Sequence, residues 1–324
     1  MTQSVAIIGA GLAGAVCARA LADAGHAVTV FEKSGGTGGR LSTRRNEAGS
    51  FDHGAQYLTA RGAPMRALLD ELAEKGAAAP WVPEGKDRAG DWHVGLPGMS
   101  GLVKPLLDGI DVRLRTPVDA IGLDAQGHVR LTDAEGRDYR FGRVVVTAPA
   151  PQAMALTLPL DPVFEALDAI VYAPCWAGMF ALDEPAADLP DVLRGDDDGP
   201  AALIVRNSSK PGRAGETFIV HGGGAWSARH LESEPDLIVP RLLGALEHGA
   251  ARRLSPVHAV AHRWRYARVD RALGEDHLMS DCGRIIVCGD GLVGGRAEAA
   301  AHSGWAAAAA ILDRQAPPCG GYTI

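Results

Sequence analysis

A glycine-rich turn between a strand and a helix lies near the start of the chain, and this order constrains the fold more than any other feature. Ser4–Ile8 is a short apolar run typical of a buried parallel strand. The sequence GAGLAG follows at residues 9–14, and Ala15–Ala24 is predicted to form a helix. A second strand is predicted over Ala27–Phe31, directly before Glu32. The order of strand, turn, helix, strand and acid predicts a dinucleotide-binding unit.

Each part of this order has a physical role in binding a dinucleotide. Gly9 permits the tight turn, Gly11 lets the backbone approach a pyrophosphate, and Gly14 allows the helix to pack closely on the strand. The helix N-terminus offers free N–H groups and a positive dipole end to phosphates. Glu32 is placed to accept hydrogen bonds from ribose hydroxyls, which favours NAD or FAD over NADP. The alternative, an ordinary glycine-rich turn, does not explain this context.

Two further features favour FAD over NAD. The sequence GGTGGR at residues 35–40 follows the acid, so a second loop can pack near the diphosphate and Arg40 can reach an anion. Near the other end, a strand is predicted over Arg284–Cys288, followed by Gly289-Asp290 and by a small-residue helix over Ala297–Ile311. An Asp here can hold the ribityl chain, and the helix can direct its N-terminus at the flavin pyrimidine. A surface turn and a capped turn are the alternatives for these two segments.

The middle of the chain agrees with this assignment. Short strands are predicted over Val112–Arg115, Val129–Thr132 and Asp138–Phe141, before a buried strand over Arg143–Thr147. Together with the two ends, this layout resembles the FAD-binding domain of the glutathione-reductase-like and amine-oxidase-like flavoproteins. The resemblance implies that Val118 faces the adenine.

Several sequence blocks narrow the resemblance. They are GGRLSTRR at 38–45, FDHGAQYLT at 51–59, GLPGMS at 95–100, RNSSKPGR at 206–213, HGGGAWS at 221–227 and HRWRYA at 262–267. Over nearly the whole chain these blocks resemble renalase and its bacterial relatives, with GAQY and SSKPGR the most specific. The resemblance implies an FAD oxidase of isomeric dihydronicotinamide dinucleotides that passes electrons to O2 and gives H2O2.

The predicted cofactor contacts come from both lines of reasoning. By resemblance, Ala13, Arg40, Gln56 and Tyr57 match FAD-contacting positions. The full predicted set is Gly9, Gly11, Leu12, Ala13, Gly14, Glu32, Lys33, Gly39, Arg40, Leu41, Gln56, Tyr57, Val118, Gly289, Asp290 and Ser303. Cys288 lies on the strand before Gly289, and we expect the FAD to be bound noncovalently.

Two segments are predicted to contact the substrate. A polar turn after a strand over Ala202–Val205 either recognises a polar substrate or is an exposed loop. Alternation on a predicted strand places His262, Trp264 and Tyr266 on one face, which either stacks a planar substrate or packs in the core. Trp226 has the same two interpretations. The predicted substrate contacts are Asn207, Ser208, Lys210, Trp226, His262, Trp264 and Tyr266.

No catalytic side chain is predicted, because the flavin carries the chemistry and hydride transfer needs mainly positioning. Asp52 and His53 are adjacent, so on a strand they point to opposite faces and do not form a dyad. We expect one of them to be structural and the other to lie on the surface. The chain shows no order of residues typical of hydrolytic triads, and no spacing of His and Cys typical of a metal site.

Composition bounds the partners and the location. The formal net charge of −7 argues against nucleic acid as a partner. The five cysteines are odd in number and form no CxxC pair, which is typical of a reduced cytoplasmic protein. No stretch is long and apolar enough to predict a membrane span.

The sequence therefore predicts an α/β fold with two domains. The first is a Rossmann-like FAD-binding domain of the glutathione-reductase or amine-oxidase type, built from 1–62, 97–154 and 257–324. The second is an α+β substrate domain with an antiparallel sheet, built from 63–96 and 155–256. Besides the renalase-like oxidase, a flavin oxidase or dehydrogenase for a small amine or metabolite and a non-catalytic flavin-binding redox sensor remain open.

Overall fold

A computed structural model describes residues 4–84 and 92–313, which form two compact units. The first unit contains residues 4–39, 103–171 and 269–313, and the second contains 40–84, 92–102 and 172–268. Within the described part of the chain, no helix has the length and apolar character needed to cross a membrane. Cys319 and the end of the predicted first domain lie outside the described residues.

A six-stranded sheet organises the first unit, in the order β17-β18-β11-β1-β2-β7. All neighbouring strands run parallel except β17, which is antiparallel to β18. The strands are β1 (Ser4–Ile8), β2 (Ala27–Phe31), β7 (Asp111–Arg113), β11 (Arg143–Val146), β17 (Leu278–Met279) and β18 (Ile285–Val287). The predicted strands at Ser4–Ile8 and Ala27–Phe31 are confirmed.

The carboxyl ends of four parallel strands meet at one edge of this sheet. Ile8 is paired with Phe31 on one side and with Val146 on the other, and Val146 is paired with Val287. Three segments therefore begin at the same edge of the sheet: the glycine turn after β1, the acid after β2 and the segment after β18. The chain leaves β1 toward β2 on one side and returns to β11 on the other, so β1 and β11 flank a topological switch point.

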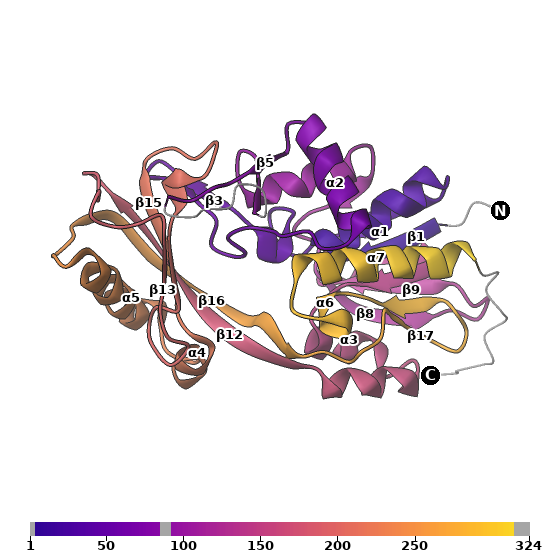
Figure 1. Ribbon diagram of the computed structural model, residues 1–324. Helices are drawn as coiled ribbons and strands as arrows, with labels where there is room; N and C mark the ends of the chain where they lie inside the picture. Colours follow the sequence, from indigo (N-terminus) through magenta and orange to yellow (C-terminus); the bar gives the residue numbers. More distant parts are fainter. Residues whose placement is uncertain (1–3, 85–91, 314–324) are drawn as a thin grey trace. The chain divides into compact units, whose positions relative to one another are not determined.

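Two small-residue helices lie side by side in this unit (Figure 1). They are α1 (Leu12–Asp23) and α7 (Ala297–Leu312), and a Cβ atom on Gly304 of α7 would lie only 2.3 Å from the Ala13 carbonyl oxygen. Glycine and alanine at the contact let the two backbones approach closely. The remaining helices of the unit are α3 (Ala150–Thr157), α6 (Asp290–Val293) and the 3-10 helices η3 (Lys104–Leu107) and η4 (Pro162–Ala169).

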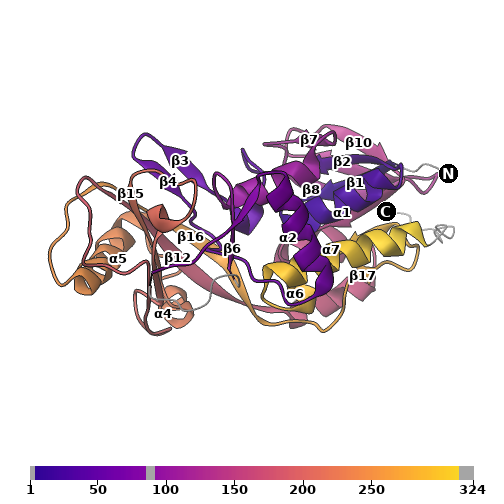
Figure 2. The ribbon, with the colours of Figure 1, turned by 45° about the horizontal axis from the view of Figure 1, so that its top comes forward.

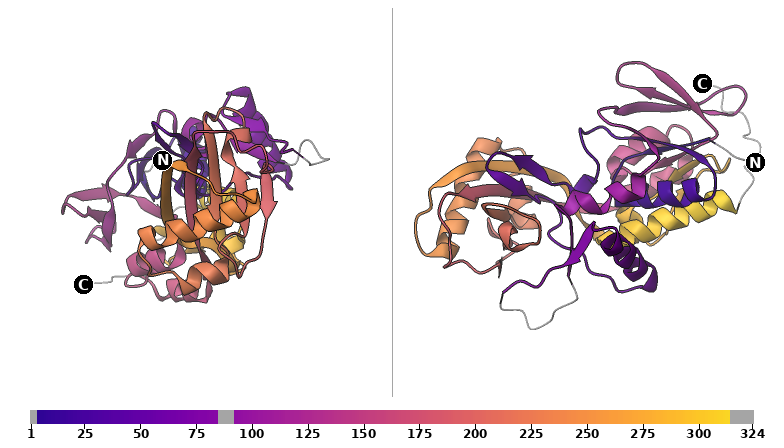
Figure 3. Two further views of the ribbon diagram at one scale, coloured as in Figure 1. Left: turned by 90° about the vertical axis from the view of Figure 1, so that its left-hand side faces the viewer. Right: turned by 90° about the horizontal axis from the view of Figure 1, so that it is seen from above.

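A separate antiparallel sheet of the first unit contains β8 (Val118–Leu123), β9 (Val129–Asp133) and β10 (Asp138–Phe141) (Figure 3). The predicted strand at Asp138–Phe141 is confirmed. The predicted strand over Val112–Arg115 is not part of this meander. Its residues Val112 and Arg113 belong to β7, which pairs in parallel with β2 at the edge of the large sheet. The third strand of the three-stranded antiparallel sheet is β8 instead.

The second unit is built on a five-stranded sheet in the order β13-β14-β15-β12-β16, with antiparallel pairing of β13, β14, β15 and β12. Its strands are β12 (Val171–Leu182), β13 (Val192–Arg194), β14 (Leu203–Arg206), β15 (Glu216–His221) and β16 (Pro256–Arg271). Two hairpins join β3 (Arg44–Asn46) to β4 (Gly49–Phe51) and β5 (Ala78–Pro80) to β6 (His93–Gly95). The helices are α2 (Ala63–Glu74), α4 (Gly224–Arg229), α5 (Pro235–Ala250) and the 3-10 helices η1 (Gly39–Leu41), η2 (Met99–Leu102) and η5 (Asn207–Ser209).

Alternating side chains of β12 serve two cores, one on each face of this sheet. Trp176 and Phe180 are fully buried in the cluster that also contains Leu242 of α5, which lies alongside the sheet (Figure 2). Met179 and Ala181 point the other way, into a smaller cluster with Phe51 of β4. A strand covered on both faces is continuously apolar, as this one is. The predicted antiparallel sheet and the mixed α/β fold class are confirmed.

The boundaries of the two units differ from the predicted domain boundaries. Residues 40–62 were predicted in the first domain but belong to the second unit, because β4 packs on β15 and Asp52 is bonded to Lys210 and Arg213. Residues 155–171 belong to the first unit instead, where Asp161 accepts the N–H of Asp281 at 2.8 Å.

Candidate active site

The glycine turn of the first unit has the shape that a pyrophosphate requires. A Cβ atom on Gly14 would lie 2.1 Å from the Gly9 carbonyl oxygen, and Gly9 itself has φ of +109°. Both positions therefore need glycine for the turn and for helix packing. A Cβ atom on Gly11 would meet no atom within 4 Å, so open space lies in front of this backbone. The first N–H groups of α1 have no partner within the helix, and Leu12 and Ala13 begin it. These residues fit a dinucleotide phosphate.

Glu32 connects the first glycine turn to the segment after β2. Its carboxylate accepts the N–H of Ala10 at 2.9 Å and that of Ser34 at 2.8 Å, and the side chain is 7% exposed. The second glycine loop pairs with the first, because Gly38 donates to the Ala10 carbonyl at 2.8 Å. Gly39 lies against Gly11, with a Cβ position 3.3 Å from the Gly11 Cα. The predicted packing of the second loop near the phosphate turn agrees with this arrangement.

The late segment of the first unit lies at the same sheet edge. Gly289 has φ of +145° and donates its N–H to the Ser303 hydroxyl at 2.8 Å, and Ser303 donates in turn to the Asp276 carbonyl. Ser303 is fully buried, so its contribution is to hold Gly289 and Asp290 in place. Asp290 is 8% exposed at the start of α6. Of the remaining predicted contacts, Lys33 donates to Gln152 and Val118 is half-buried on β8.

The second unit contains the other predicted cofactor contacts. Arg40 donates to the Ala267 carbonyl at 3.2 Å, and the neighbouring Leu41 is buried. The Arg40 carbonyl accepts the Ala55 N–H at 2.8 Å. A Cβ atom on Gly54 would lie 2.0 Å from the same carbonyl oxygen, so only glycine allows this approach. The turn that carries Gln56 is thus fixed against Arg40.

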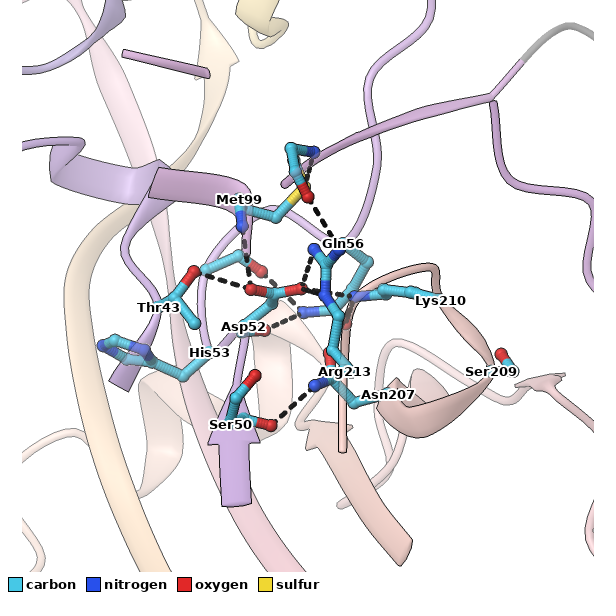
Figure 4. Close-up of polar contacts among 12 residues, drawn as sticks. Thr43, Ser50, Asp52, His53, Gln56, Met99, Asn207, Ser209, Lys210 and Arg213 are labelled. Atoms are coloured by element: carbon cyan, nitrogen blue, oxygen red, sulfur yellow. Dashed lines mark hydrogen bonds and ion pairs between the residues drawn. The ribbon is translucent and has the colours of Figure 1, made fainter. Parts of the chain in front are cut away.

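A fully buried carboxylate lies behind this turn and is satisfied on both oxygens (Figure 4). Asp52 Oδ1 accepts the Thr43 hydroxyl at 2.7 Å and the Met99 N–H at 3.0 Å. Asp52 Oδ2 accepts Lys210 Nζ at 3.2 Å and Arg213 Nη2 at 2.6 Å. Burial raises the pKa of Asp52, but the two cations and these hydrogen bonds lower it further, to about 2. We call these five residues the Asp52 cluster.

One prediction about these residues is wrong, and one of two open interpretations is excluded. Asp52 and His53 do not divide into a structural and a surface residue, because they are only 0% and 6% exposed. The turn over 207–213 is not an exposed loop, because Asn207, Lys210 and Arg213 are buried with protein partners. Apolar neighbours enclose neither segment in the sequence, so local pattern gives no sign of this burial. Asn207 and Lys210 are therefore not carried into the proposed substrate site.

A group of aromatic and imidazole rings forms the second feature of this unit. The rings of His53 and Trp264 stack with centroids 5.2 Å apart, and His262 meets both rings edge-on at 4.9 and 4.5 Å. The Trp264 indole N–H donates to the His53 carbonyl at 2.8 Å, and His221 Nε2 lies 3.3 Å from the same oxygen. His262 and Trp264 are half-buried while Arg263 between them is exposed, as the predicted alternation requires.

All three imidazoles of this group are neutral at pH 7. Burial lowers the pKa of His53 most, and together with His262 and Arg44 it brings this pKa to about 4. Burial and Arg44 also bring the pKa of His262 to about 4, and burial does the same for His221. The ring group is thus an uncharged surface of flat side chains.

The other predicted substrate contacts have separate surroundings. Tyr266 meets Tyr172 edge-on, with centroids 5.6 Å apart. Trp226 belongs to the core cluster of the second unit and is 6% exposed, which supports its core interpretation. Ser208 donates to Glu216 at 3.3 Å. Of the predicted substrate contacts, His262 and Trp264 are therefore the two that belong to the ring group.

Sequence reasoning missed several residues of this region. His221 was noted only as part of a sequence block, and His53 was assigned no role. Trp92 stacks on Tyr57 with centroids 3.7 Å apart and planes at 6°, and Arg194 donates to the Tyr57 hydroxyl at 2.9 Å. The recurrence of Trp and His in a chain with only 5% aromatic residues is the signal that could have pointed to this cluster.

Two family models together match nearly the whole described chain. Residues 7–72 match the NAD(P)-binding Rossmann-like domain, and residues 72–312 match the flavin containing amine oxidoreductase family. The second match covers most of the chain. The predicted flavin cofactor and the predicted oxidoreductase class are confirmed by it.

Curated relatives match only a short stretch. An L-amino-acid oxidase of Mus musculus is 51% identical over 45 residues, which are 14% of this chain and 7% of that protein. A 4,4'-diapophytoene desaturase (4,4'-diaponeurosporene-forming) of Staphylococcus aureus is 42% identical over 52 residues, which are 16% of this chain and 10% of that protein. The aligned stretches thus span no more than a tenth of either relative.

Solved structures match over almost the full length and show the fold. A putative protoporphyrinogen oxidase from Exiguobacterium sp. 255-15 has a TM-score of 0.75 at 14% identity, covering 97% of this chain and 100% of that one. Cyclohexylamine oxidase from Brevibacterium oxydans IH-35A has a TM-score of 0.72 at 17% identity, with the same coverage. Together with the family match, the geometry leads to one conclusion: the chain belongs to the flavin containing amine oxidoreductase family and is a flavin-dependent oxidoreductase.

Proposed function

We propose that this chain is a renalase-like, FAD-dependent oxidase of isomeric dihydronicotinamide dinucleotides. The observation that carries the proposal is the neutral ring group of His53, His221, His262 and Trp264 in the second unit. A flat, uncharged surface suits a planar and uncharged substrate ring. The GAQY and SSKPGR blocks support the same assignment by resemblance.

A dihydronicotinamide needs little from the protein besides orientation. The ring nitrogen lone pair drives departure of the hydride, and the product is an aromatic nicotinamide cation. No proton leaves the substrate in this step, so no general base is required. Trp264 and His262 orient the ring by stacking, and their low polarity excludes water from its face. The absence of a predicted catalytic acid or base is consistent with this chemistry.

The glycine turns of the first unit support FAD as the form of the flavin. Gly11 leaves space for a pyrophosphate, and Glu32 keeps a carboxylate beside the turn for a ribose hydroxyl. The cofactor, when bound, accepts the hydride and passes two electrons to O2, which takes up two protons to give H2O2. We propose noncovalent binding, because Cys288 is fully buried and burial raises its thiol pKa to about 12.

An amine substrate is the second candidate, and the family match favours it. An amine is oxidised only as the free base, and a neutral imidazole of the ring group can accept the proton of an ammonium ion. The two candidates therefore differ in their need for proton transfer, which an experiment can separate. A non-catalytic flavin-binding redox sensor is the remaining alternative.

Anaerobic flavin reduction tests these candidates directly. The purified yellow protein is mixed with isomeric dihydronicotinamide dinucleotides made by borohydride reduction of NAD, with ordinary NADH, and with cyclohexylamine in parallel. Rapid loss of flavin absorbance with the isomers alone, followed by H2O2 formation on admitting air, is the expected result. Bleaching by the amine alone would assign amine oxidation. A protein that none of these compounds bleaches would favour the sensor, and a yellow protein without extractable flavin would overturn the noncovalent binding.

A further inference from the structure

Lys210 is a lysine whose ammonium group has no access to water. Its side chain is 0% exposed, and Nζ lies 3.2 Å from Asp52 Oδ2, 2.9 Å from Gln56 Oε1 and 3.0 Å from Asn207 Oδ1. Three acceptors match the three N–H bonds of an ammonium group. The cation therefore makes its full set of hydrogen bonds inside the protein, and none is left for a substrate.

These bonds decide the orientation of the Gln56 amide. An ammonium group only donates, so the amide atom facing Lys210 must be the oxygen. The amide NH2 then faces the carbonyls of Asp52 and Gly54, to which it donates. Gln56 is 4% exposed, and protein groups bond both the oxygen and the nitrogen of its amide. Without the cation, the amide oxygen loses its hydrogen-bond donor and only the NH2 end stays bonded, to the two carbonyls.

The segment that Lys210 holds is the one predicted to contact the flavin. Gln56 follows Ala55, whose N–H is bonded to the Arg40 carbonyl at 2.8 Å. Lys210, Gln56 and Arg40 are therefore linked by a short series of hydrogen bonds within the second unit. The cluster also carries an excess of positive charge, because Asp52 is paired with both Lys210 and Arg213. Burying a second cation costs free energy that a purely structural pair does not require.

We propose that Lys210 is a positioning residue for the flavin, which orients Gln56 and, through it, holds the turn over 54–57 in its cofactor-binding conformation. The inference rests on Gln56 as a flavin contact, which is part of the proposed function. Lys210 itself does not touch the cofactor or the substrate in this assignment.

A double-mutant cycle on FAD affinity tests the proposal. Lys210→Met removes the cation, Gln56→Met removes the amide, and the third variant carries both changes. We expect Lys210→Met to raise the Kd for FAD about tenfold, which corresponds to the loss of a charged hydrogen bond of about 1.4 kcal/mol. We expect the same change to have less than a twofold effect in the Gln56→Met background, because the cation then has nothing to orient. Lys75→Met on α2 is the matched control, because Lys75 is exposed and its ion pair is with the exposed Glu71.

A Kd for FAD that is unchanged by Lys210→Met would overturn the proposal, and so would an equal effect in both backgrounds. If Lys210→Met does not fold, a pH titration of the wild-type flavin spectrum replaces the cycle. Burial and the neighbouring Arg213 lower the pKa of Lys210 to about 8, while Asp52 raises it in part. The groups that face its ammonium are Asp52, Arg213, His221, Gln56, Asn207 and the Trp81 ring at 5.5 Å.

The expected titration shows a change in flavin absorbance centred near pH 8 in the wild type. The change is absent in Gln56→Met, and a flat wild-type titration would overturn the proposal. Both measurements use oxidised flavin and no substrate. The proposed substrate can therefore fail in the anaerobic reduction assay while the positioning role stands, and the reverse result is equally distinguishable.

Discussion

The indole ring of Trp264 stacks on the His53 imidazole at 5.2 Å, and its N–H donates to the carbonyl of the same residue at 2.8 Å. One side chain thus makes two different contacts with one partner, which fixes the plane of its ring. His262 meets both rings edge-on, so the orientation is supported from a second side. A ring held in this way can orient a planar substrate without first losing its own rotational freedom.

We therefore expect Trp264 to contribute to substrate affinity. Trp264→Ala removes the stacking surface and should raise the Kd of the isomeric dihydronicotinamide dinucleotide by about 10- to 100-fold, or about 1–3 kcal/mol. Trp264→Phe keeps a ring but loses the N–H bond to His53, so its effect should be smaller. Anaerobic stopped-flow measurement of flavin reduction against substrate concentration separates this Kd from the limiting rate.

Trp226→Phe is the control for a tryptophan change in the same unit. Trp226 lies in the core cluster, so this variant should lower the thermal unfolding temperature and leave the substrate Kd unchanged. Equal substrate affinities of Trp264→Ala and the wild type would contradict the proposed substrate face.

The two glycines of the first turn should respond differently to an added methyl group. At Gly14 the new Cβ would lie 2.1 Å from the Gly9 carbonyl oxygen, so Gly14→Ala should lower stability by about 2 kcal/mol or more, or prevent folding. At Gly11 the Cβ meets no protein atom within 4 Å, and φ of −78° suits alanine. Gly11→Ala should therefore fold normally and lose FAD affinity.

Thermal unfolding of the apoproteins and the flavin content per chain measure these two effects. A Gly11→Ala protein with full flavin content would show that no cofactor group approaches this backbone. Normal stability of Gly14→Ala would show that the turn adjusts more easily than its geometry indicates.

The dinucleotide unit was predictable because its signals are local. β1 and β2 have the predicted bounds, since each is a short apolar run that ends at a glycine or an acid. α1 begins at Leu12 and not at Ala15, because the last residues of the glycine turn already have helical geometry. The late helix was predicted from its small residues, and Gly304 shows why they are needed against Ala13.

The Asp52 cluster was not predictable in the same way. Asp52 and Lys210 are 158 positions apart, and nothing near either residue indicates a buried charge. Lysine is almost never fully buried unless it is paired, so an exposed loop is the usual expectation for a polar turn. The predicted domain boundary at residue 62 differs from the boundary of the compact units for the same reason, because this long-range pairing draws residues 40–62 into the second unit.

Removal of the Asp52 carboxylate should destabilise the protein strongly. Asp52→Asn leaves Lys210 and Arg213 buried without a counter-charge, and we expect a loss of about 3–5 kcal/mol in the free energy of unfolding. Thr43→Val removes only one hydrogen bond and should cost about 1 kcal/mol. Urea unfolding near neutral pH measures both variants, with the exposed Asp70→Asn on α2 as control.

The pH dependence of the Asp52 contribution follows from its pKa of about 2, which is below the ordinary 3.8. The folded state therefore holds the proton less tightly than the unfolded state. The stabilisation is fully present above pH 3.8 and is lost as pH falls through 2. An unfolding free energy of Asp52→Asn equal to that of the wild type near neutral pH would show that the two cations find other partners.

The neutral histidines of the ring group should also make stability fall as pH is lowered, but in a higher pH range than the Asp52 effect. His53, His221 and His262 have pKa values of about 4 in the folded state and 6.5 in the unfolded chain. Between these values the unfolded state binds more protons, so the stabilisation is present above pH 6.5 and is lost as pH falls through 4.

Each histidine adds up to about 1.4 kcal/mol per pH unit to the slope of the unfolding free energy against pH. Unfolding by urea at several pH values should show this slope reduced by about a third in His262→Gln. The same slope in His262→Gln and in the wild type would mean that the ring group is already open to water in the folded protein.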